Sequence, residues 1–161
     1  MRVFKMFRFA WETKYWLDRL IALREEELQK SIRGGRQEKI EKKLLDPDSP
    51  DLFSEMDGVS VNVTLNVTAG SVIEQAVRHA RGLKPEDWEE LSVEMESAKK
   101  KIEDNVSGKD ATPRVCMNLE IYRELEEIRR MLKEKGSGLR VPRMTYIIKL
   151  VVFNLFRSKI K

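Results

Sequence analysis

The last fifty residues place a short alternating segment directly before two apolar-patterned segments, and this order restricts the fold more than any other feature. Residues 114–118 alternate polar and apolar side chains, which predicts a half-buried strand. Apolar residues recur at helical spacing from Asn118, a candidate N-cap, to the break at 136–138. Residues 142–157 are apolar nearly all round, which predicts a helix buried on most sides. One strand and two helices cannot close a hydrophobic core alone, so this segment requires a partner.

Composition places the chain among intracellular globular proteins. Its 161 residues suffice for one domain or two very small ones, and the high content of Lys, Arg and Glu resembles that of thermophile proteins. The single cysteine, Cys116, excludes an intrachain disulfide framework and multi-cysteine zinc patterns. We recognise no signal-peptide pattern and no apolar run long enough to span a membrane, so we expect a cytoplasmic protein without membrane, metal or cofactor.

Charge is distributed in blocks of alternating sign. Residues 1–43 carry 12 basic and 7 acidic side chains, residues 44–111 carry 7 and 15, and residues 112–161 carry 12 and 5. Only the two ends of the chain therefore suit a polyanionic partner.

Residues 2 to about 32 show helical periodicity, interrupted at Gly34-Gly35, and we expect a helical extension over 1–45. Half of the chain's twelve aromatic residues lie in its first sixteen positions, with basic residues interleaved. We favour a helix that packs in the core, in a dimer or against a protein partner. A helix on a membrane surface and a segment that stacks on nucleic-acid bases are the alternatives.

The middle of the chain, 58–104, has the pattern of a strand followed by two helices. Val59 to Leu65 alternates with β-branched residues and gives the clearest strand signal. Helix signals follow from about Thr68 to Ala80 and, after Gly82, from Pro85 to about Ile102. We therefore expect a separate strand–helix–helix unit here.

Catalytic chemistry has little support in the sequence. His79 has neither a cysteine nor a second histidine with which to bind a metal ion. The acidic residues after Pro85 are explained by the dipole of the helix that they begin. No nucleophile lies beside a recognisable base, so we do not expect an enzyme.

The spacing of apolar residues over 111–161 resembles the ribbon-helix-helix family of DNA-binding regulators. Counted from Met117, apolar positions at +4, +8 and +11 are Ile121, Leu125 and Ile128, and the core positions of the second helix correspond to Val141, Ile147, Leu150, Val151 and Leu155. The resemblance implies a mainly α fold with short β-strands. In this fold two strands pair into a ribbon that enters the DNA major groove, and the strands come from two protomers or two repeats. It also implies a nucleoid-associated transcriptional regulator or repressor that binds double-stranded DNA as a homodimer or an intrachain pseudo-dimer.

The resemblance assigns DNA contacts to particular residues. The outward side chains of the strand are Thr112, Arg114 and Cys116, with Asn118 at the margin. The start of the second helix, with Arg143 and Thr145, would hold a phosphate. If 58–104 is a degenerate second copy, its outward strand residues Ser60, Asn62 and Thr64 would add uncharged contacts, and its strand would pair with 114–118.

A different class of function fits the same sequence. Alternating strands with outward Arg and Thr are ordinary solvated sheet faces, and the apolar terminal helices could bury a partner protein. The alternative is thus a helical protein-interaction subunit, antitoxin-like or part of a ribonucleoprotein complex, without sequence-specific DNA binding.

Overall fold

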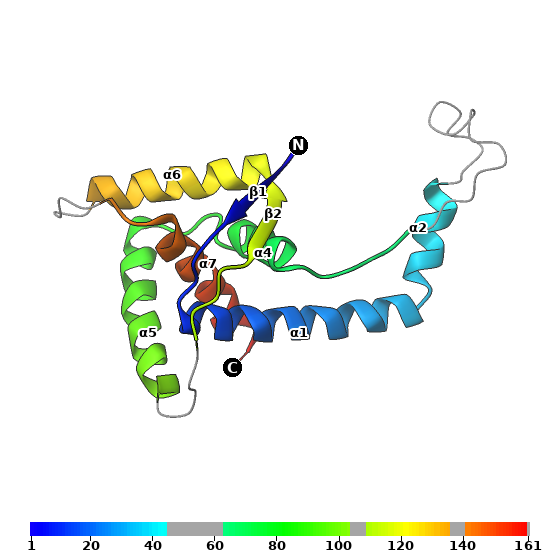
Figure 1. Ribbon diagram of the computed structural model, residues 1–161, viewed down its shortest axis with the longest axis horizontal. Coiled ribbons are helices and arrows are strands. Elements are labelled where there is room, and N and C mark those ends of the chain that lie inside the picture. Colours follow the sequence, from blue (N-terminus) through cyan, green and yellow to red (C-terminus); the bar gives the residue numbers. More distant parts are fainter. Residues whose placement is uncertain (45–62, 104–108, 136–140, 161) are drawn as a thin grey trace. The chain divides into compact units, whose positions relative to one another are not determined.

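The computed structural model describes residues 1–44, 63–103, 109–135 and 141–160 (Figure 1). Within these ranges the chain is mainly helical with one two-stranded antiparallel sheet, so the expected fold class is confirmed at this level. The elements are, in chain order, β1 (Arg2–Met6), α1 (Trp11–Arg33), α2 (Arg36–Leu44), α4 (Ala69–His79), α5 (Pro85–Glu103), β2 (Arg114–Asn118), α6 (Leu119–Lys135) and α7 (Met144–Lys159). None of the helices described is long and apolar enough to cross a membrane.

The chain divides into two compact units, one made of Met1–Ile21 and Thr68–Lys161, the other of Ala22–Val67. In the second unit α1 ends and α2 begins around Gly35, whose φ of +81° suits a residue without a Cβ atom. None of the described residues of this unit is buried. The hydrophobic core of the described structure therefore belongs to the first unit, which groups the first 21 residues with the C-terminal segment.

The sheet is a ribbon in which β1 and β2 run antiparallel, with Arg2 opposite Asn118 and Met6 opposite Arg114. An isolated bridge between Phe9 and Ala111 continues the pairing in the same register. Between the two paired stretches this register places Phe7 opposite Pro113, which has no backbone N–H to donate. The ladder is interrupted there because of the proline, while the register is kept.

The predicted helix from residue 2 is wrong over its first nine residues. Phe4 and Phe7 are three positions apart, as on one helical face, yet Phe4 is 58% exposed and Phe7 is buried. The strand places Val3, Phe7 and Phe9 on the inner face and Phe4 on the outer face. Pairing with β2, more than a hundred residues away, decides this conformation.

The described part of the middle strand expected at Val59–Leu65 does not pair with β2. Residues 63–65 carry no strand, and residues 59–62 lie outside the described ranges. β1 occupies one edge of β2, and the start of α4 lies along the other, where a Cβ atom on Gly70 would be 1.8 Å from the Cys116 carbonyl oxygen. Glu74 on α4 accepts a hydrogen bond from the Asn118 backbone N–H at 2.7 Å. Both edges of β2 are therefore occupied from within the first unit.

Helix α7 forms the centre of the core, among α4, α5 and α6 (Figure 1). Of the core positions that the resemblance predicts, seven are buried, namely Met117, Ile121, Leu125, Ile147, Leu150, Val151 and Leu155. Ile128 is only half-buried, and Val141 is 42% exposed because it precedes the first turn of α7. The core also contains Val115 from β2, Ile73 and Ala76 from α4, and Trp88 and Leu91 from α5. The buried start of α1 adds Trp16, whose ring centroid lies 4.8 Å from that of Phe153.

We expect replacement of Gly70 by Ala to destabilise the protein by about 1–3 kcal/mol, because the added methyl group collides with the backbone of β2. Urea denaturation measures this change. Gly34→Ala is the control, since its nearest non-adjacent atom would be 3.4 Å away. Equal stability of the two variants would contradict the close approach of α4 to β2.

Candidate nucleic-acid interface

One face of the ribbon is directed away from the core. We call it the ribbon face; the register gives it Arg2, Phe4 and Met6 from β1, opposite Asn118, Cys116 and Arg114 from β2. Phe4 and Met6 are 58% and 70% exposed. The guanidinium carbon of Arg114 lies 4.2 Å from the Phe4 ring centroid, so the aromatic ring supports and orients this cation. Arg114, predicted to project from the strand, is exposed on this face.

Cys116 is half-buried and covered by Arg2. The Arg2 Nε atom lies 3.5 Å from the Cys116 Sγ atom, and Arg2 Nη2 donates to the Cys116 carbonyl at 3.3 Å. The same Nη2 atom is 3.0 Å from Glu74 Oε1. At the Cys116 position the ribbon face therefore exposes the Arg2 guanidinium, and the Cys116 thiol lies beneath it.

Asn118 and Thr112 mark the two ends of the predicted contact strand. Asn118 Oδ1 accepts the Glu120 backbone N–H at 2.8 Å, so Asn118 caps the start of α6 as predicted, and its side-chain oxygen is committed there. Thr112 is exposed and lies between the Phe9–Ala111 bridge and β2. In the common register of the ribbon it is opposite Arg8.

A hollow of about 360 Å³ lies at the N-terminus of α7 and brings the predicted residues Arg143 and Thr145 together with Arg8 and Lys149. We call it the α7 hollow; it is also lined by Ala10, Thr13, Asp110 and Tyr146. Arg143 is the N-cap of α7 and makes no side-chain capping hydrogen bond, so the first backbone N–H groups of α7 remain for an external acceptor. The hollow thus combines three basic side chains with a helix N-terminus.

Acidic residues partly balance these cations. Asp110 lies 3.5 Å from Arg8, in a pair that is largely exposed and weak. Glu12, only 2% exposed, lies 3.0 Å from Lys149 Nζ and 3.8 Å from Lys99 Nζ. Burial alone would raise the pKa of Glu12, but a backbone hydrogen bond and the two lysines outweigh burial and lower the pKa. Lys149 is thereby held in place, while Arg143 forms no ion pair with the described acidic residues.

Of the three contacts predicted in the middle segment, the structure describes one. Ser60 and Asn62 lie outside the described residues, and Thr64 is exposed in the second unit, without strand structure. Sequence reasoning did not assign Arg2, Phe4, Met6, Arg8 or Lys149 to the interface. Their signal was the interleaving of basic and aromatic residues at the N-terminus, which fitted a helix equally well.

Comparisons of the chain with models of protein families, with curated proteins and with solved structures find no significant match.

We expect Glu12→Gln to destabilise the protein by about 2–3 kcal/mol at neutral pH, because Lys149 loses its buried partner. Folding lowers the pKa of Glu12 below the ordinary value of a glutamate. The ionised Glu12 therefore contributes fully to the free energy of unfolding above that ordinary value, and this contribution is lost as the pH falls through the folded-state pKa. The difference from wild type should therefore shrink in acid. Thermal unfolding across a pH series measures it, with Glu89→Gln, an exposed carboxylate on α5, as the control. A difference that does not depend on pH would contradict the ionised pair.

Proposed function

We propose that the chain is a sequence-specific DNA-binding regulator that places the ribbon face in the major groove. The observation that carries the proposal is the exposed Arg114 guanidinium, held against Phe4 on a two-stranded antiparallel ribbon. The major groove admits such a ribbon, and an arginine there makes a bidentate contact with guanine. Phe4 and Met6 supply apolar contacts of the kind that recognise the methyl group of thymine.

Phosphate binding would be the task of the α7 hollow. Arg143, Arg8 and the first N–H groups of α7 offer charge-assisted hydrogen bonds to a phosphate oxygen. Such contacts fix the orientation of the ribbon on the duplex without reading its sequence. The ribbon face and the α7 hollow both belong to the first unit, to which the two basic ends of the sequence contribute.

The proposal differs from the ribbon-helix-helix family in the origin of the second strand of the ribbon. In that family the second strand of the ribbon comes from another protomer or repeat, whereas here β1 pairs with β2 within the same chain. One chain would then carry a complete ribbon. A homodimer would present two ribbons to two half-sites.

A second candidate function rests on the unit Ala22–Val67. Its described part has no buried residue, although Leu23, Leu28, Ile32 and Ile40 are apolar and half-exposed. Such a surface favours a helical protein-interaction subunit. The solution state of the isolated chain distinguishes the two: a well-folded chain that binds DNA alone supports the first, and a chain that aggregates without another protein supports the second.

We expect Arg114→Ala to relax sequence preference. Selection from a randomised duplex library identifies the preferred site, and fluorescence anisotropy then compares it with a site altered at one guanine. Loss of the bidentate contact should remove about 1–3 kcal/mol of discrimination at one base pair while non-specific binding persists. Arg130→Ala, at an exposed position on α6, is the matched control. If no sequence is enriched, or if Arg114→Ala leaves the preference unchanged, the proposed reading of DNA is wrong.

We expect Arg143→Ala to act differently from Arg114→Ala. Removing a phosphate contact should weaken binding to all duplexes by a similar factor and lower the slope of log K against log salt concentration by about one. Anisotropy titrations over a salt series measure the slope. An unchanged slope would remove the α7 hollow from the interface.

A further inference from the structure

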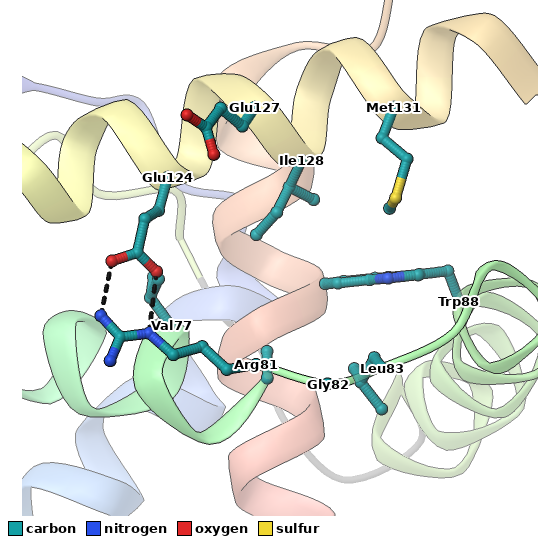
Figure 2. A pocket seen from close by; sticks show the side chains of 10 residues that line it. Val77, Arg81, Gly82, Leu83, Trp88, Glu124, Glu127, Ile128 and Met131 are labelled. Atoms are coloured by element: carbon teal, nitrogen blue, oxygen red, sulfur yellow. Dashed lines mark hydrogen bonds and ion pairs between the residues drawn. The ribbon is translucent and has the colours of Figure 1, made fainter.

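A second hollow, of about 340 Å³, lies between α6 and the turn that joins α4 to α5 (Figure 2). We call it the α4–α6 hollow. Its walls are apolar and come from three helices and the turn: Val77, Ala80, Leu83, Trp88, Ile128 and Met131. In Figure 2 the Ile128 and Met131 side chains descend from α6 towards the Trp88 ring, with Leu83 below. Its volume lies at the lower end of the range for small-molecule sites.

The opposite end of the α4–α6 hollow is polar and carries an excess of negative charge. The Arg81 guanidinium donates from Nε to Glu124 Oε2 at 3.0 Å and from Nη2 to Glu124 Oε1 at 2.5 Å, so this pair neutralises itself. Glu127, one turn further along α6, lines the hollow and is exposed. It forms no ion pair with a basic side chain of the described ranges. One carboxylate is therefore left to receive a cation.

The turn leaves the hollow open to solvent. Gly82 has a φ of +89°, and a Cβ atom built there would meet no other atom within 4 Å. A larger residue would be strained in this conformation. The glycine thus permits the tight turn that lines the hollow.

We propose that the α4–α6 hollow binds a small organic cation, a primary amine with an aryl or alkyl body. The apolar body packs against Trp88, Ile128 and Met131, and the ammonium group donates hydrogen bonds to the Glu127 carboxylate. An anion of the same shape is disfavoured by the Glu127 carboxylate, and a neutral analogue lacks the charge-assisted contact. This site is separate from the ribbon face and the α7 hollow, so it does not depend on DNA binding.

The test uses three molecules that share one body, namely phenylbutylamine, phenylbutanol and phenylbutanoate. Heteronuclear NMR of the full chain follows the indole N–H signals of its three tryptophans, and Trp88→Phe assigns the one in the hollow. We expect the amine to shift the Trp88 signal with a Kd of about 1 mM or tighter and to leave the Trp11 and Trp16 signals in place. The alcohol should bind about threefold to fivefold more weakly, and the carboxylate more weakly still.

Glu127→Gln should remove the advantage of the amine over the alcohol without changing the affinity for the alcohol. Glu134→Gln, which removes an exposed carboxylate from the same helix outside the hollow, is the matched control and should keep the wild-type order. Both positions are exposed, so neither variant should unfold. The proposal is overturned if none of the three molecules shifts the Trp88 signal, if the carboxylate binds as well as the amine, or if both variants behave alike.

Discussion

The first unit depends on one buried carboxylate, that of Glu74 on α4. It accepts a hydrogen bond from the Asn118 backbone at 2.7 Å and pairs with the Arg2 guanidinium at 3.0 Å. A single side chain therefore joins the N-terminal strand, a helix from the middle of the chain and the C-terminal strand. Because a buried carboxylate is costly without such partners, the three segments stabilise one another only when they are assembled together.

This junction gives the two faces of the ribbon different environments. The inner face places Val115 and Met117 against the core around α7, where both are almost fully buried. The outer face keeps Arg114, Phe4 and Met6 in solvent. The C-terminal segment needed a partner to close its core, and β1, α4 and the start of α1 provide it within the same chain. The face proposed for DNA and the hollow proposed for an amine are thus carried by one packed unit, at separate places.

Local pattern was enough to predict α4, α5, α6 and most of α7, because a long amphipathic helix is specified by its own periodicity and caps. Local pattern failed at residues 2–10, where Phe4 and Phe7 have the spacing of a helix while Val3, Phe7 and Phe9 have the spacing of a strand. Pairing with β2 resolves that ambiguity, and β2 lies more than a hundred residues away along the chain, beyond the reach of any local pattern. The α7 hollow shows the same limit: Arg143 and Thr145 were predicted from the start of the helix, but only tertiary packing brings Arg8 into the hollow and Glu12 against Lys149.

By itself the sequence determined the helical segments, the inward residues of β2 and α6, and the strongly apolar character of α7. These properties follow from side-chain order along one element, because burial of an apolar stripe needs only a periodic pattern. Tertiary structure alone decided which strand pairs with β2, which side chains share the ribbon face, and where Glu74 and Glu12 find their partners. Those choices depend on hydrogen bonds and ion pairs between residues far apart in the chain, whose positions are set only after the core has closed.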